Sequence, residues 1–107
     1  MDIKTLTNEI EEVSKKYTSK FDIKRDDDWY ILKLQEEVGE LMQAYLMLTK
    51  RARQKNMSDT EIRDKFEKEV ADVLGQLLLI SNNFNINLEK VVEEKWLVWN
   101  RVRKNST

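Results

Sequence analysis

Hydrophobic residues recur along this chain at spacings of three and four, the period of amphipathic helices, in four separate segments. The first segment predicts a helix over residues 3–19. The others predict helices over residues 27–50, 58–82 and 88–104. We therefore expect an all-α fold, a four-helix bundle formed by a single domain over residues 1–107.

The starts of these predicted helices carry residues that commonly cap helix N-termini. Three aspartates at positions 26–28 precede the second segment, where carboxylates accept hydrogen bonds from free backbone N–H groups. Metal binding by these aspartates is the alternative. Ser58 and Glu61 form a capping-box pattern before the third segment, and Asn87 is a suitable cap for the last one. The basic residues at 101–104 suit the C-terminal end of a helix dipole.

The second predicted helix is apolar on more than one face. Ile31, Leu34 and Val38 lie on one line along it, whereas Leu32 and Met42 lie off that line. A helix of this kind must be covered on several faces, and a four-helix monomer covers only one of them well. We therefore expect a homodimer, or a homotetramer formed as a dimer of dimers.

Composition and charge narrow the possible chemistry. The chain has no Cys and no His, which excludes disulfides, thiolate or imidazole ligands and a histidine base. The formal net charge of -1 gives no general case for a nucleic-acid partner. Since no apolar run reaches about 18 residues and the first residues lack a signal-peptide core, we expect no membrane partner and a cytoplasmic location.

Two pairs of acidic residues interrupt otherwise apolar stretches of the second and third predicted helices. Glu37 and Glu40 form one pair, and Glu69 and Asp72 form the other. Residues three apart share a helix face, so two packed helices would bring the four carboxylates together. Ionised carboxylates in apolar surroundings must be paired, protonated or metal-bound. The sequence therefore predicts an oxygen-ligand site for Mg²⁺, with Mn²⁺ as an alternative.

The two glycines of the chain strengthen this hypothesis. Gly39 and Gly75 each lie beside one acidic pair, where a helical glycine costs about 1 kcal/mol relative to alanine. Their positions suggest a close approach of backbones at the acidic centre. The competing interpretation is a buried network of ion pairs with Lys33, Lys68 or Lys95.

The segment Glu36-Glu37-Val38-Gly39-Glu40-Leu41, followed by Glu69-Val70-Ala71-Asp72-Val73-Leu74, resembles the paired motif of the MazG-like all-α nucleotide pyrophosphohydrolases. The resemblance extends from about residue 29 to residue 95. It implies Mg²⁺ held by the four acids, a dimeric or tetrameric helical assembly, and cleavage of a nucleoside triphosphate to a monophosphate and pyrophosphate. House-cleaning of non-canonical or excess dNTPs is the role it suggests.

The resemblance also implies positions for substrate binding. Lys95 falls where some relatives have a phosphate-binding lysine. Gln76 stands where some relatives have a tyrosine, and Trp99 stands where they have an asparagine, with Asn100 one place further on. These departures affect the polar contacts with the nucleotide more than they affect the metal site.

The chemistry of such a site assigns further roles to residues near the acids. Glu36 or Glu37 would act as general base, and Lys33 would contact phosphate. Phe21 and Trp29 could stack on the base, with Met47 at the rim; the alternative for each is packing in the core or in a dimer interface. The basic segment at residues 50–56 is either a solvated connector or a loop that attracts polyphosphate.

Three alternatives remain open at the level of sequence. A related enzyme could act on phosphoribosyl-ATP, a substrate that the shared motif does not separate from a dNTP. A non-catalytic helical dimerisation module would use the acids in buried salt bridges. A di-iron carboxylate bundle normally requires Glu-x-x-His pairs, which a chain without histidine lacks. The second and third helices are weakly alike around their acidic pairs, and we find no internal repeat.

Overall fold

The computed structural model describes residues 1–100, which form helices and connecting loops with no strand among them. The helices are α1 (Ile3–Lys20), α2 (Asp27–Leu48), α3 (Asp59–Asn83) and α4 (Leu88–Val92). A π-helical turn, η1 (Glu93–Leu97), continues α4. The all-α prediction is confirmed, and the predicted helices agree with these bounds to within two residues except at the last C-terminus. The predicted end at 101–104 lies outside the described residues.

The helix starts follow the capping chemistry that the sequence indicates. The Asp26 side chain accepts a hydrogen bond from the Trp29 backbone N–H at 2.8 Å, so it caps α2. Ser58 and Glu61 form the predicted capping box at the start of α3, and Asn87 caps α4. Capping accounts for Asp26 without any metal.

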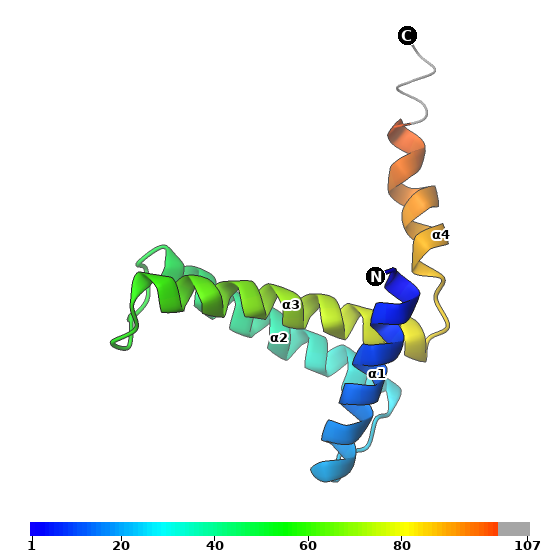
Figure 1. Cartoon of the computed structure of the whole chain (residues 1–107), viewed down its shortest axis with the longest axis horizontal. Coiled ribbons are helices and arrows are strands. Elements are labelled where there is room, and N and C mark those ends of the chain that lie inside the picture. Colours follow the sequence, from blue (N-terminus) through cyan, green and yellow to red (C-terminus); the bar gives the residue numbers. More distant parts are fainter. Residues whose placement is uncertain (101–107) are drawn as a thin grey trace.

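The centre of the molecule is a long antiparallel hairpin of α2 and α3 (Figure 1). Most of the fully buried apolar side chains lie where these two helices face each other. They are Tyr30, Ala44 and Met47 from α2, and Ile62, Leu78 and Leu79 from α3. Each of these side chains is at most 6 % exposed, so the hairpin is the hydrophobic core of the chain.

The first helix crosses one end of this hairpin, and the loop between α2 and α3 lies at the other end (Figure 1). A short ion pair fixes the crossing: Arg25 Nη1 is 2.6 Å from Glu11 Oε1, and both side chains are about 15 % exposed or less. The loop at residues 49–58 folds on itself, because Gln54 Nε2 donates to the carbonyls of Met47 and Ala52 at 2.9 Å each.

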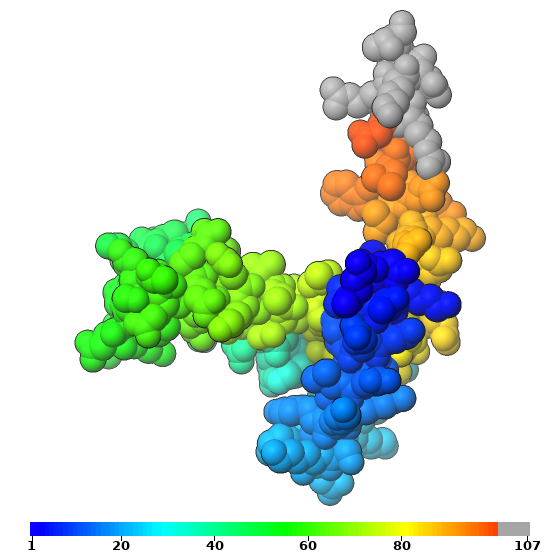
Figure 2. All heavy atoms as spheres, in the orientation of Figure 1, coloured from blue at the N-terminus to red at the C-terminus, as the bar shows by residue number. Residues whose placement is uncertain are grey.

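The four helices do not close into a compact bundle within one chain. The helical segment over residues 88–100, which comprises α4, η1 and the residues after them, projects away from the hairpin as a separate arm (Figures 1 and 2). The radius of gyration is 17.4 Å. A compact domain of this length would have a radius of gyration of about 13 Å. Large apolar side chains consequently remain exposed on the arm, such as Trp96 and Trp99, and on α2, such as Leu32 and Met42.

Candidate metal centre

Four carboxylates converge at the middle of the hairpin. Glu37 and Glu40 come from α2, and Glu69 and Asp72 come from α3. One carboxylate oxygen from each residue lies within 4.8 Å of the corresponding oxygens of the others. The three-residue spacing within each helix places both members of a pair on the face that meets the other helix. The predicted convergence is confirmed, and metal binding by these residues stays a prediction.

The cluster has an inner and an outer half. The side chains of Glu37 and Glu69 are only 13 % and 10 % exposed. Glu40 and Asp72 are exposed to solvent. The expectation that all four acids lie in an apolar interior is therefore wrong for two of them. Glu40 and Asp72 lie one turn along their helices from the buried pair, at the open edge of the helix interface.

Two lysines approach the inner glutamates from the same helices. Lys33 Nζ is 3.7 Å from Glu37 Oε1, and Lys65 Nζ is 3.4 Å from Glu69 Oε1. Two cations cannot neutralise four carboxylates, so the cluster keeps an excess of negative charge. Lys65 was missed in the sequence, although its spacing of four residues from Glu69 is typical of a helical ion pair.

The competing interpretation was a buried network of ion pairs between the acids and Lys33, Lys68 or Lys95. The structure forms only part of that network. Lys68 pairs with Asp64 at 2.7 Å, away from the cluster. Lys95 lies in η1 on the projecting arm (Figure 1). Of the three lysines proposed as partners of the acids, only Lys33 contacts one of them among the described residues.

Two buried oxygens of the cluster have no hydrogen-bond partner in the part of the chain that the structure describes. They are Oε2 of Glu37 and Oε2 of Glu69. Buried carboxylate oxygens are almost always hydrogen-bonded or metal-bound, because an unsatisfied charged group in a protein interior is costly. The two lysines contact the other oxygen of each carboxylate, which leaves the Oε2 atoms available to a further ligand. An all-oxygen set of this kind fits Mg²⁺ or Mn²⁺.

Two acids of the cluster, Glu37 and Asp72, have a raised pKa. Burial raises the pKa of Glu37 first, and the charges of Glu40, Asp72 and Glu69 add to it against the opposing effect of Lys33. The pKa of Asp72 is also raised, by loss of hydration and by the charge of Glu69. A divalent cation between the carboxylates would oppose both shifts, because it favours the charged forms.

A cleft of about 540 Å³ opens beside the cluster, a volume within the range of small-molecule sites. Lys33, Glu37 and Asp72 line its polar side. Trp29 lies in the same cleft, as the stacking prediction requires, though its role there stays a prediction. The opposite wall comes from α1, including Val13 and Tyr17. Nothing in the sequence of α1 places it at the site, because its pattern is that of an ordinary amphipathic helix.

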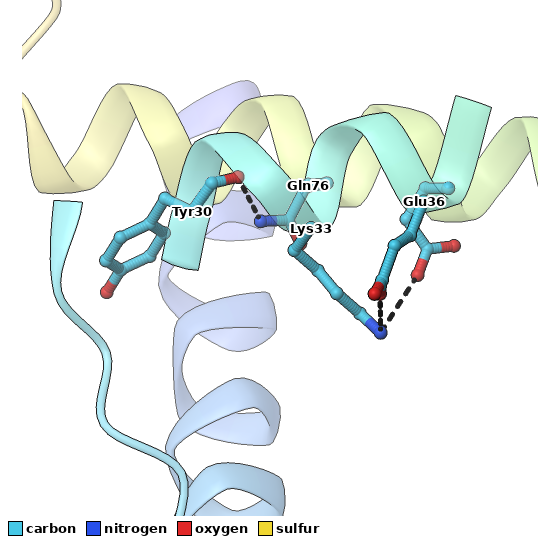
Figure 3. Close-up of polar contacts among 5 residues, drawn as sticks. Tyr30, Lys33, Glu36 and Gln76 are labelled. Carbon is cyan, nitrogen blue, oxygen red and sulfur yellow. Dashed lines mark hydrogen bonds and ion pairs between the residues drawn. The ribbon is translucent and has the colours of Figure 1, made fainter. Parts of the chain in front are cut away.

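The predicted polar residues around the acids already have partners within the chain (Figure 3). Lys33 Nζ donates a hydrogen bond to Glu36 Oε2 at 3.1 Å, and this contact raises the lysine pKa. Gln76 is buried and its Nε2 donates to the backbone carbonyl of Tyr30 at 3.0 Å. Gln76 thus joins α3 to α2 one turn beyond Asp72, and it also lines the cleft.

Other predicted site residues lie elsewhere in the chain. Phe21 is 56 % exposed and packs on Tyr17, outside the lining of the cleft. Met47 is 4 % exposed, so its placement at a rim is wrong: it faces the core of the hairpin. Asn100 belongs to the projecting arm with Lys95. The structure does not bring these arm residues to the acids of the same chain.

The expected close approach of backbones at the two glycines is also wrong within one chain. No heavy atom lies within 4 Å of the position that a Cβ would occupy on Gly39. On Gly75 such a Cβ would meet Ile10 Cδ1 at 4.0 Å, an ordinary van der Waals distance.

Residues 1–100 include no helix that is both long enough and apolar enough to cross a membrane. Comparison with known proteins found no match to the chain among family models, curated proteins or solved structures.

Proposed function

We propose that this chain is a Mg²⁺-dependent nucleoside triphosphate pyrophosphohydrolase that cleaves a (d)NTP to the monophosphate and pyrophosphate. One observation supports it above the others: four carboxylates converge, and two of their buried oxygens lack a hydrogen-bond partner among residues 1–100. The adjoining cleft has an aromatic residue, Trp29, and a cation, Lys33, as a base and a phosphate would require.

In this proposal each residue has a distinct task. Glu37, Glu40, Glu69 and Asp72 hold Mg²⁺, which when bound neutralises charge on the phosphate oxygens. Lys33 contacts a phosphate oxygen, and Trp29 offers a flat surface to the base. Glu36 lies outside the four-acid cluster and has a 66 % exposed side chain hydrogen-bonded to Lys33. Either Glu36 or Glu37 would act as the general base.

The proposal includes a homo-oligomer as the active assembly. The chain exposes 8622 Å² of surface. A compact monomer of 12.8 kDa would expose only about 6,300 Å². The excess of about 2,300 Å² exceeds the roughly 800 Å² that each partner buries in a standard interface. A second copy covering the arm and the exposed face of α2 would bury large apolar side chains such as Leu32, Met42 and Trp96.

Hydrolysis of a panel of nucleotides tests the proposed activity. The full chain is incubated with Mg²⁺ and each of the canonical dNTPs, NTPs and phosphoribosyl-ATP, and pyrophosphate release is measured. We expect pyrophosphate and a monophosphate as products, with release that stops when the metal is chelated. Release of orthophosphate instead, or no release from any substrate, would contradict the proposal.

Thermal unfolding separates this function from the dimerisation module. Mg²⁺ binding to the native cluster should raise the melting temperature, because a ligand that binds only the folded state stabilises it. Replacing Asp72 by Asn should remove that rise. Asp64→Asn is the matched control, since Asp64 is also on α3 but pairs with Lys68 outside the cluster. A dimerisation module would show no metal-dependent rise.

A further inference from the structure

Residues of similar chemistry occupy equivalent positions along α2 and α3. The equivalent positions, each separated by 32 residues, are Lys33 and Lys65, Glu37 and Glu69, and Glu40 and Asp72. The equivalence extends along both helices: the N-caps Asp26 and Ser58 correspond at the same separation, as do the buried residues Tyr30 and Ile62. It is thus longer than the weak likeness around the acids that the sequence indicated.

An antiparallel pair of equivalent helices is related by an approximate two-fold axis across the pair. Each lysine precedes its glutamate by four residues, so Lys33 and Lys65 lie on opposite sides of the acid cluster along the hairpin. The distances follow this symmetry: Lys33 is 3.7 Å from Glu37, and Lys65 is 3.4 Å from Glu69. The acids are therefore flanked by one cation on each side.

The surroundings of the two lysines break the symmetry. On the Lys33 side, α1 covers the cleft and adds apolar and aromatic side chains, including Val13 and Tyr17. On the other side a second cleft of about 470 Å³ is lined almost entirely by charged residues. They are the lysines Lys65 and Lys68 and the acids Glu61, Asp64, Glu69 and Asp72. Asp72 lines both clefts, so both adjoin the acid cluster.

We propose that Lys65 is a second phosphate-binding residue and that it gives the bound nucleotide a fixed direction. The base lies in the cleft covered by α1, and the terminal phosphates extend across the acid cluster to Lys65. This inference rests on the proposed function and replaces Lys95 as the second lysine within the chain. The Lys65 side chain is 40 % exposed, so it can turn from Glu69 to an incoming anion when a cation occupies the cluster.

Binding measurements on the full chain test this assignment without relying on turnover. Mn²⁺ binding is measured by electron paramagnetic resonance, and the affinity for inorganic tripolyphosphate is then measured calorimetrically at saturating Mn²⁺. Lys65→Met should weaken tripolyphosphate binding about 10-fold, the loss expected for one charge-assisted hydrogen bond. The same substitution should leave Mn²⁺ binding intact or tighten it, because it removes a positive charge beside Glu69.

Arg63→Met is the matched control. Arg63 is on the same helix and pairs with Glu67 at 2.9 Å, but it lines neither cleft. We expect this variant to bind both probes as the wild type does. A structural role for Lys65 would not weaken one ligand while sparing the other. Unchanged tripolyphosphate binding in Lys65→Met, or an equal loss in Arg63→Met, would overturn the assignment.

The direction of the nucleotide has its own test. Lys65→Met should weaken binding of a non-hydrolysable dNTP analogue but not of the corresponding dNMP, whereas Trp29→Ala should weaken both and spare tripolyphosphate. Equal effects of Lys65→Met on the dNTP analogue and the dNMP would refute the direction. If the wild type binds no Mn²⁺, the proposed function fails and this inference fails with it. If it binds Mn²⁺ but no tripolyphosphate, only this inference fails.

Discussion

Two groups of buried charge lie in this chain, and they differ in whether their charges cancel. Where α1 crosses the hairpin, Glu11 meets Arg25 at 2.6 Å, one negative charge against one positive charge. At the middle of the hairpin, Lys33 and Lys65 are the only cations of residues 1–100 that pair with the four carboxylates. The charges of the first group cancel, although Glu11 Oε2, Arg25 Nε and Arg25 Nη2 have no hydrogen-bond partner among the described residues. The second group keeps an excess of negative charge, which is why we assign a cation to it and not to the first.

We call Glu11 and Arg25 the neutral pair, because their two charges cancel. The surroundings of this pair suit a structural role. The Arg25 guanidinium lies 5.2 Å from the centre of the Tyr30 ring and 6.0 Å from that of Trp29. The pKa of Glu11 is lowered and that of Arg25 is raised, each mainly by the hydrogen bond between them. Both shifts have the same cause and favour the charged forms. In the acid cluster, by contrast, burial and like charges raise the pKa of Glu37 and Asp72.

The largest expected effect comes from breaking the neutral pair. Arg25→Met leaves Glu11 buried without its partner and should lower the free energy of unfolding by about 3–5 kcal/mol. Urea denaturation checks this value. The double variant Glu11→Met with Arg25→Met should recover most of the loss, because no uncompensated charge remains. A loss of less than about 1 kcal/mol in the single variant would mean that the pair contributes no more than an exposed ion pair.

A substitution in the acid cluster should weaken metal binding without lowering the stability of the metal-free protein. Glu69→Gln should reduce Mg²⁺ affinity more than about 100-fold, since even the residues that only orient a ligand contribute about 10- to 100-fold. The metal-free protein should be as stable as the wild type or more stable, because one of the repelling charges is gone. Titration of Mg²⁺ followed by thermal unfolding measures both quantities. A strongly destabilised metal-free variant would place this cluster with the neutral pair.

The smallest effect is a pH dependence that belongs to the neutral pair. Because the folded state lowers the pKa of Glu11, the pair's contribution is complete above the ordinary value of 4.5 and is lost as pH falls through the folded value. The contribution is about 1.4 kcal/mol for each unit by which the pKa is lowered. The difference in unfolding free energy between wild type and Glu11→Gln should therefore be constant from pH 7 to 5 and shrink below about pH 4.5. Urea denaturation across this range measures it.

The acid cluster could be predicted from the sequence, whereas the pair of Glu11 and Arg25 could not. The acid cluster depends on spacings within two helices, and these spacings are visible in the chain as Glu37 with Glu40 and Glu69 with Asp72. The N-caps Asp26 and Ser58 likewise depend only on residues close to them in the sequence. Each of these predictions requires only the period of a helix and the chemistry of its first turn.

The parts that could not be predicted depend on how the helices cross. Arg25 lies in a segment without periodicity, and nothing in the sequence connects it with Glu11 on the preceding helix. The wall that α1 adds to the cleft follows from that crossing. The arm is a similar case: Lys95 shares a stripe with apolar residues, but the stripe does not specify which surface the helix covers. The 32-residue equivalence of α2 and α3 extends beyond the acids to the N-caps and to buried positions, which the structure identifies.

The loop at residues 49–58 has a practical consequence for anyone who wishes to modify this protein. Along α2 it begins about 12 Å beyond Glu40, and along α3 it ends about 15 Å before Glu69, at 1.5 Å per helical residue. The hydrogen bond between Gln76 and Tyr30 fixes the alignment of the two helices at the other end of the hairpin. An epitope tag or a fluorophore inserted in this loop would therefore give a handle for immobilisation or energy-transfer experiments while the acidic centre keeps its geometry.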